Sequence, residues 1–267
     1  MSTVYIDPLL AAAFNSLDAL IGEGSWSGSG RPEQEAFLGK LGALTETIAS
    51  LPPGAIETIA ARSAGPVNAF LARHGFTGNL REAGPQSLYA AAVLDLLVEW
   101  VTPGSAVQLA LRDGRLAPGV RLKKGHFRVD GRVLSPEVKP GPICVRMCES
   151  ATLDEGLAII AGTIYVAPSS DYGAATFPMV SLDVDVDASK MIGLRNGDWT
   201  VDQAFARAKL RLDPKGAHAK AAAAVAATRG IVKTFKIAGP FTIAFVTGDG
   251  KVAIAYHVTE EHFSAPA

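Results

Sequence analysis

Residues 204–230 read AFARAKLRLDPKGAHAKAAAAVAATRG, and this stretch decides how the rest of the chain is interpreted. Its first part, Arg207–Leu212, alternates polar and apolar residues, a pattern that predicts a strand. The sequence Asp213-Pro214-Lys215-Gly216 then ends the strand in a turn. Eight of the eleven residues 217–227 are alanine, and intrinsic propensity alone predicts a helix over them.

The same alanine-rich segment is also suited to enter a sheet as an added strand. Alternation places Ala217, Ala219, Ala221 and Ala223 on one face, which is uniformly small and apolar. The opposite face carries its polar groups first, at His218 and Lys220. Alanine loses no side-chain entropy on ordering, and its poor strand propensity would keep the segment out of a sheet until something released it. Helix and added strand both stay open at this point.

These residues resemble the reactive loop of the serpins, protease inhibitors whose loop inserts into a sheet after cleavage. The stretch RAKLRLDPKGAHAKAAAA (residues 207–224) is similar to the strand, turn, glycine and small-residue hinge that open that loop. Downstream, FKIAGPFTIAFVTGDGKVAIAYHV (residues 235–258) resembles the family's C-terminal signature. Phe235, Pro240 and Phe241 stand there at the family's spacing.

Weaker similarity extends the resemblance back to about residue 66. VNAFLARHGFTGNL (residues 67–80) resembles a serpin helix carrying an asparagine and an aromatic residue, here Asn68 and Phe70. LYAAAVLDLLVEWVTPG (residues 88–104) would then be the family's long central strand, although its composition predicts a helix. FRVDGRV (residues 127–133) and MVSLDVDV (residues 179–186) fall where the family has strands.

The resemblance implies an α+β, serpin-like fold of reduced size, with N-terminal helices, mixed and antiparallel sheets and an exposed reactive loop. It implies one domain over residues 1–267, mainly helical over 1–85 and mainly sheet over 86–267, with the loop at about 213–234. It also implies an inhibitor of a serine or cysteine protease rather than an enzyme. The protease cleaves the loop, forms an acyl-enzyme, and is trapped when the loop inserts.

The family scheme assigns roles to individual residues of the loop. The implied hinge comprises Gly216, Ala217, Ala219, Ala221 and Ala223. The implied scissile region comprises Arg229, Gly230 and Ile231, with Arg229–Gly230 as the first choice of bond and Gly230–Ile231 and Lys233–Thr234 behind it. Arg229 as the specificity residue implies a trypsin-like target protease.

The loop departs from the family pattern at several positions. Ala217 replaces the usual hydroxyl residue, Lys220 interrupts the small residues, and Pro214-Lys215 replaces an acidic pair. The chain and its loop are also short. These departures favour a second hypothesis, a serpin-fold protein that no longer inhibits and serves in binding or structure. A third is an unrelated α+β protein in which residues 217–227 form a helix.

Hydrophobic periodicity predicts helices in the first third of the chain and strands after about residue 105. Helices are expected over residues 8–23, from Pro32 to about residue 48, over 53–61 and over 66–74. Strands are expected at 107–111, 143–148, 157–166 and 180–186. Two hairpins are expected, one over 126–134 around Asp130-Gly131, the other over 241–258 around Gly248-Asp249-Gly250. Helices followed by strands indicate an α+β fold.

Composition limits the classes of function. Of the 267 residues 48% are hydrophobic and 19% charged, which excludes general disorder. The net charge of −1 is not that of a nucleic-acid binder. The sequence has no apolar run long enough to cross a membrane and no visible signal peptide, so we expect a soluble, cytoplasmic monomer, although secretion by another route stays open.

No residue pattern predicts a metal, a cofactor or an active site. Cys144 and Cys148 on one strand would be about 13 Å apart, too far for a disulfide. The five histidines are scattered, and we expect His257 and His262 to lie in a solvated tail. The cluster Arg121, Lys123 and Lys124 is interpreted as a solvated turn.

Overall fold

A computed structural model describes residues 3–22, 25–77, 80–84, 87–163, 171–217 and 233–265 of the chain. The chain divides into two compact units. The first comprises Met1–Tyr5, Leu96–Asp183 and Lys209–Ala267, and the second comprises Ile6–Asp95 and Val184–Ala208. The boundary falls within the paired strands β11 (Val180–Asp185) and β14 (Arg207–Leu212). That residues 1–267 behave as one domain stays a prediction.

The second unit contains the N-terminal helices and two pairs of antiparallel strands, β2 with β3 and β12 with β13. Its elements are α1 (Asp7–Ile21), α2 (Pro32–Ala49), β2 (Ile56–Ala61), α3 (Ala64–Arg73), β3 (Tyr89–Leu94), η1 (Ser189–Met191), β12 (Arg195–Asn196) and β13 (Trp199–Thr200). α1 begins with Asp7 and Pro8, which favour the first turn of a helix. Its apolar stripe of Leu10, Phe14 and Leu17 is buried. The helices predicted near residues 8–23, 32–48 and 66–74 are confirmed as α1, α2 and α3.

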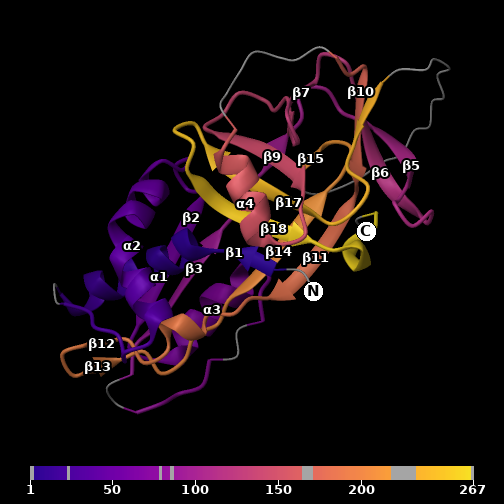
Figure 1. Ribbon diagram of the computed structural model, residues 1–267. Helices are drawn as coiled ribbons and strands as arrows, with labels where there is room; N and C mark the ends of the chain where they lie inside the picture. The colour runs from indigo at the N-terminus through magenta and orange to yellow at the C-terminus, as the bar shows by residue number, and fades with distance from the viewer. Residues whose placement is uncertain are drawn as a thin grey trace. The chain divides into compact units, whose positions relative to one another are not determined.

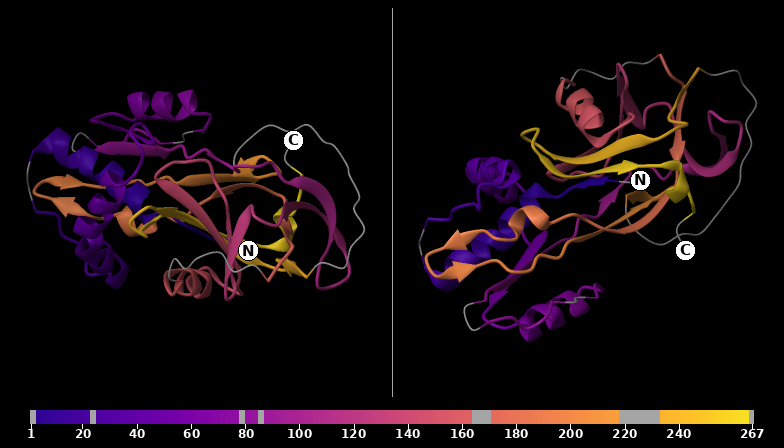
Figure 2. Two further views of the ribbon diagram at one scale, coloured as in Figure 1. Left: turned by 90° about the horizontal axis from the view of Figure 1, so that it is seen from above. Right: turned by 60° about the horizontal axis from the view of Figure 1, so that its bottom comes forward.

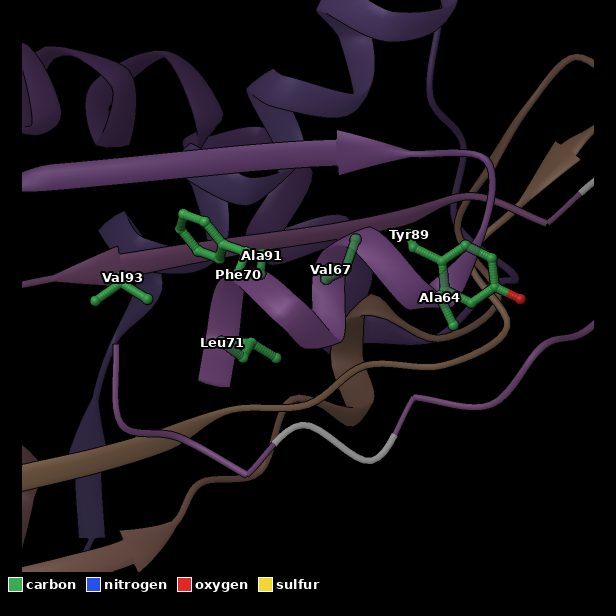
Figure 3. Packing of buried hydrophobic residues seen from close by; sticks show 7 residues of the cluster. All are labelled: Ala64, Val67, Phe70, Leu71, Tyr89, Ala91 and Val93. Atoms are coloured by element: carbon green, nitrogen blue, oxygen red, sulfur yellow. The ribbon is translucent and has the colours of Figure 1, made fainter. Parts of the chain in front are cut away.

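Helix α3 packs on the sheet formed by β2 and β3 (Figure 3). Four residues of the helix and three of β3 form one buried cluster: Ala64, Val67, Phe70, Leu71, Tyr89, Ala91 and Val93. Alternate β3 residues share a face, so Tyr89, Ala91 and Val93 are buried while the residues between them are only partly buried. The helix that composition predicts within residues 88–104 is therefore wrong. The strand that the resemblance implies is confirmed over Tyr89–Leu94 and Val98–Glu99.

The helix predicted over residues 53–61 is also wrong. Pro52 and Ala55 close a turn in which Gly54 has a φ of +81°, and β2 follows. β2 pairs with β3 along its whole length, from Ile56 opposite Leu94 to Ala61 opposite Tyr89. A short apolar run fits helix or strand equally well, and pairing with β3 decides between them.

The first unit contains most of the strands. Its six-stranded sheet has the order β1-β18-β17-β9-β8-β7, its four-stranded sheet has the order β16-β10-β6-β5, and β15 pairs with β4. Its elements, besides parts of β11 and β14, are β1 (Thr3–Tyr5), β4 (Val98–Glu99), β5 (Ser105–Ala110), β6 (Leu116–Lys123), β7 (Phe127–Asp130), β8 (Val133–Pro136), β9 (Ile143–Glu149), α4 (Leu153–Ala161), β10 (Ala174–Pro178), β15 (Gly216–Ala217), β16 (Thr234–Lys236), β17 (Phe241–Thr247), β18 (Val252–Val258) and η2 (Glu260–His262).

Both predicted hairpins are confirmed. β7 and β8 meet at a turn in which Gly131 has a φ of +54°, and β17 and β18 meet at a turn in which Gly250 has a φ of +87°. The yellow strands β17 and β18 run side by side in both views of Figure 2. The strands predicted at residues 107–111, 143–148 and 180–186 are confirmed as β5, β9 and β11.

The strand predicted over residues 157–166 is wrong where the structure describes it. Residues 157–161 belong to helix α4, which lies against β17 and β9 (Figure 1). The helix begins because the Thr152 hydroxyl accepts a hydrogen bond from the Glu155 amide at 3.1 Å. Gly156 allows close approach, since a Cβ there would lie 2.3 Å from the Cβ of Thr242. Residues 164–166 of the prediction lie outside the described residues.

The side chains first considered as ligands are mostly structural. Cys144 and Cys148 are free thiols on β9, and burial raises the pKa of Cys148 to about 11. The prediction of a solvated tail is wrong for His257, which is buried in β18 because β17 and β1 pair on its two sides. Within the described ranges, no group of three His, Cys, Asp or Glu side chains could hold a metal ion. No described helix is long and apolar enough to cross a membrane.

Candidate reactive-loop site

The turn after β14 is held by the carboxylate of Asp213. Its Oδ1 oxygen accepts hydrogen bonds from the Lys215 amide at 2.7 Å and the Gly216 amide at 3.2 Å. The Asp213 amide donates to the Gly216 carbonyl at 3.0 Å, which closes the turn. Asp213 is only 1% exposed, so this turn is an internal part of the first unit. The strand and turn predicted over residues 207–216 are confirmed.

Three hydrogen bonds from residues 100–104 fix the carbonyl groups of that turn. The Trp100 indole donates to the Asp213 carbonyl at 3.1 Å, and the Trp100 amide donates to the Lys215 carbonyl at 2.9 Å. The Gly104 amide donates to the Pro214 carbonyl at 2.7 Å. Trp100 is itself buried and contacts Phe177 edge to face, with ring centroids 6.2 Å apart. The carbonyl groups of residues 213, 214 and 215 therefore all accept a hydrogen bond.

Gly216 and Ala217 form β15, which pairs antiparallel with β4. Gly216 lies opposite Glu99 and Ala217 opposite Val98. A Cβ at residue 216 would stand 2.2 Å from the Val98 carbonyl oxygen, so only glycine fits against β4. Ala217 is 1% exposed, which places its methyl group in the interior. The first two residues of the expected hinge are thus already part of a sheet.

The structure brings together only part of the predicted site. Gly216 and Ala217 lie on β4 as described, while Ala219, Ala221 and Ala223, together with Arg229, Gly230 and Ile231, lie outside the described residues. Trp100 and Val98, the partners of this segment, are not predicted from the sequence. They are more than 110 residues away along the chain, and no local pattern connects them with it.

Soon after residue 232, the chain enters the four-stranded sheet as strand β16. β16 pairs parallel with β10, with Thr234 opposite Ala174 and Lys236 opposite Thr176. The Lys233 carbonyl accepts a hydrogen bond from the Gly173 amide at 2.9 Å. Both ends of the expected loop are therefore anchored by backbone pairing.

Glu149 fixes the connection between β16 and β17. Its Oε1 oxygen accepts from the Ala238 amide at 2.6 Å and the Gly239 amide at 3.1 Å, and its other oxygen accepts from the Arg112 guanidinium. The Arg112 amide donates in turn to the Ala238 carbonyl at 3.1 Å. One carboxylate thus orders the segment that carries Pro240, a residue of the C-terminal signature.

No family model matches the sequence, and no curated protein matches it either. Solved structures do match. Human glycosylated kallistatin aligns with a TM-score of 0.59 at 12% identity, over 100% of this chain and 92% of that one. The fold is serpin-like. Serpin48 of the insect Tenebrio molitor, titled a highly specific serpin, aligns with a TM-score of 0.55 at 11% identity, over 94% of this chain and 96% of its own.

A third serpin-like match is thyroxine-binding globulin in complex with thyroxine. It aligns with a TM-score of 0.58 at 11% identity, over 96% of this chain and 92% of that one. The predicted α+β, serpin-like fold is therefore confirmed. The helix of the third hypothesis falls, beyond Ala217 of β15, outside the described residues. At this identity the serpin-like likeness concerns the fold alone.

Proposed function

We propose that this protein inhibits a serine or cysteine protease by cleavage and insertion of the segment from Gly216 to about residue 234. The nucleophile of the protease attacks the carbonyl carbon of Arg229, the bond to Gly230 breaks, and the Gly230 amine leaves with a proton. The products are a new chain end and an acyl-enzyme, an ester with serine or a thioester with cysteine. Inhibition results when insertion distorts the protease before water hydrolyses that bond.

The pairing of β15 with β4 is the observation that carries this proposal. It sets both the direction and the register of a growing strand, since Gly216 lies opposite Glu99 and Ala217 opposite Val98. Continued in this register, His218 and Ala219 of the cleaved protein would lie opposite Leu97 and Leu96. Further pairs add backbone hydrogen bonds, and every second residue of the added strand buries a small side chain, as in other cases of strand addition.

The hinge proposed for insertion comprises Gly216, Ala217, Ala219, Ala221 and Ala223. Ala217 is buried, and alternation places the three alanines that follow it on the same inward face. Small side chains on that face need no rearrangement of the core. We further propose that Arg229 selects a trypsin-like protease and that the protein acts as a monomer.

Thermal melting of the intact and the singly nicked protein tests the proposal. Insertion predicts a sharp rise in Tm after a nick within residues 218–232, and a covalent complex with trypsin that survives denaturing electrophoresis. The variant Ala219→Arg should abolish both, because an inward arginine blocks the growing strand. Lys220→Arg, one residue along and facing outward, is the matched control and should abolish neither. An unchanged or lower Tm after a verified nick would refute insertion.

A serpin-fold binding protein without inhibitory activity is the second candidate. Ala217 in place of a hydroxyl residue and Lys220 within the small run favour it, and thyroxine-binding globulin, titled as a complex with thyroxine, is among the matching structures. This candidate predicts a loop that is cut by trypsin as an ordinary substrate. Complete cleavage without a covalent complex and without a rise in Tm would favour it.

A further inference from the structure

The four-stranded sheet carries basic residues that strand register brings together. Arg121 of β6, Thr176 of β10 and Lys236 of β16 lie directly opposite one another on three neighbouring strands. Lys123 lies two residues along β6 from Arg121 and therefore shares its face. We call Arg121, Lys123 and Lys236 the basic face. Its backbones lie within about 12 Å of each other, since they span two strand spacings and two residues along a strand.

The opposite side of the same strands is apolar, which fixes the orientation of the basic face. Val120, Leu122 and Phe177 alternate with the polar positions and are each at most 1% exposed. Lys123 and Lys236 are exposed, and Arg121 is half-buried. The hydroxyl residues Thr176 and Thr234 share their side of the sheet, by register and alternation. Cations flanked by hydroxyl groups are the chemistry that binds carboxylates and other anions.

The charges of the basic face are not neutralised within the described part of the chain. None of its three side chains has a carboxylate within 4 Å there. Other basic residues of the same unit differ, because Arg112 pairs with Glu149 and Lys139 with Glu99. An unpaired group of cations on a chain of net charge −1 is a local feature, suited to a partner that presents several negative charges at once.

Two more lysines extend the positive charge along one end of this sheet. The Lys124 amide donates to the Gly173 carbonyl at 3.1 Å, and the Gly173 amide donates to the Lys233 carbonyl at 2.9 Å. The three backbones therefore lie side by side across the sheet, and both lysines are exposed. Lys233 also stands 4.8 Å above the ring of Tyr172. The sequence alone shows only the cluster at residues 121–124, because Lys233 and Lys236 join it through strand pairing.

We propose that the basic face binds an acidic surface of the protease that attacks the loop, an inference that rests on the proposed function. β16 follows the loop directly, so Lys236 is seven residues from Arg229 and at most about 25 Å from it in extended chain. A protease domain of about 220 residues has a radius of gyration of about 17 Å. A protease engaged at Arg229 is thus large enough to reach the basic face, and complementary charge there raises the association rate.

Two trypsins, one of acidic and one of basic isoelectric point, serve as probes, since both cleave after arginine. The measured quantity is the second-order rate of cleavage within residues 218–232, at low and at moderate salt. The wild type should react faster with the acidic enzyme, with a strong salt dependence. The triple variant R121Q/K123Q/K236Q should lose about tenfold with the acidic enzyme at low salt. Circular dichroism and Tm confirm that each variant is folded.

The matched control is K40Q/R81Q/R195Q, which removes the same charge at exposed positions of the second unit. It should change the rate by less than about twofold. Equal rates for the two triple variants with the acidic enzyme would overturn the proposal. A second outcome would also overturn it. If R121Q/K123Q/K236Q loses binding to dextran sulfate but is cleaved by the acidic enzyme at the wild-type rate, the basic face binds a polyanion and not the protease.

If the protein does not inhibit proteases, the experiments give a result that differs from the one that would overturn the basic-face proposal. Cleavage without covalent complex refutes inhibition but leaves the rates, and therefore the basic face, measurable. If neither trypsin cleaves the segment, binding of the catalytically inactive acidic trypsin (nucleophile Ser→Ala) is measured instead. Binding that is equal for wild type and R121Q/K123Q/K236Q would then overturn the proposal.

Discussion

Substituting Gly216 by alanine should separate β15 from β4. The added methyl carbon would stand 2.2 Å from the Val98 carbonyl oxygen and 2.9 Å from the Cα of Glu99. Both obstacles are backbone atoms in a sheet, so neither can turn aside as a flexible side chain would. Relieving the contact requires the strand to move away by about 1 Å, which breaks its hydrogen bonds to β4.

The loss of stability expected for Gly216→Ala follows from the contacts that the pairing of β15 with β4 provides. Losing two backbone hydrogen bonds at about 1 kcal/mol each, with some loss of burial at Ala217, lowers the free energy of unfolding by about 2–3 kcal/mol. For a chain of this size that corresponds to a fall in Tm of about 5–10 °C. Hydrogen exchange should show the Ala217 amide losing its protection, while the amides of β17 and β18 keep theirs.

The matched control is Gly248→Ala. Gly248 lies in the turn between β17 and β18, and its nearest neighbour to an added Cβ is the Pro142 carbonyl oxygen at 3.9 Å, an ordinary contact. This variant should melt within about 1 °C of the wild type. If Gly216→Ala behaves like the control and Ala217 stays protected, the close approach of β15 to β4 does not exist and the register argument for insertion fails with it.

Three further predictions concern polar groups that are buried or half-buried. Glu149→Ala should lower the free energy of unfolding by about 2–4 kcal/mol in denaturant titrations. Glu149→Gln should lower it by less, because the side-chain amide oxygen still accepts from Ala238 and Gly239. Equal losses for the two variants would contradict this. Asp213→Ala should lower Tm by several degrees and Asp213→Asn by much less, because the asparagine oxygen can still accept from the turn amides; equal Tm values would refute the role of Oδ1. Burial lowers the pKa of His257, so below about pH 6.5 the unfolded chain takes up more protons than the folded one, and stability should fall as the pH drops through that region. His257→Gln should flatten this slope in melts between pH 7 and 5, and an unchanged slope would show that the ring is not buried in its neutral form.

Local signals in the sequence predicted the elements that are fixed by local chemistry. The hairpin turns at Gly131 and Gly250 and the turn from Asp213 to Gly216 were all predictable, because glycine and aspartate at these positions determine the backbone within four residues. The resemblance added the strand over Tyr89–Leu94, which composition alone assigned to a helix.

The wrong secondary-structure predictions concern segments whose conformation depends on residues distant in the sequence. Residues 56–61 form a strand because β3 pairs with them, and residues 157–161 form a helix whose Gly156 fits against Thr242. The same limit applies to the candidate site. Its hinge residues could be named from the resemblance. The indole of Trp100, which binds the turn before them, and the backbone of Val98, which pairs with Ala217, come from another part of the chain.

The anchoring of β16 also discriminates between the candidate scissile bonds. Cleavage at Lys233–Thr234 would require attack on the Lys233 carbonyl, which accepts a hydrogen bond from the Gly173 amide, while Thr234 is already paired with Ala174. A protease would have to detach β16 before it could bind this bond in extended form. Arg229–Gly230 lies four residues earlier in the sequence, before β16 begins. Mass spectrometry of the nicked protein should therefore find a new N-terminus at Gly230, and a predominant N-terminus at Thr234 would show that the pairing of β16 with β10 opens readily in solution.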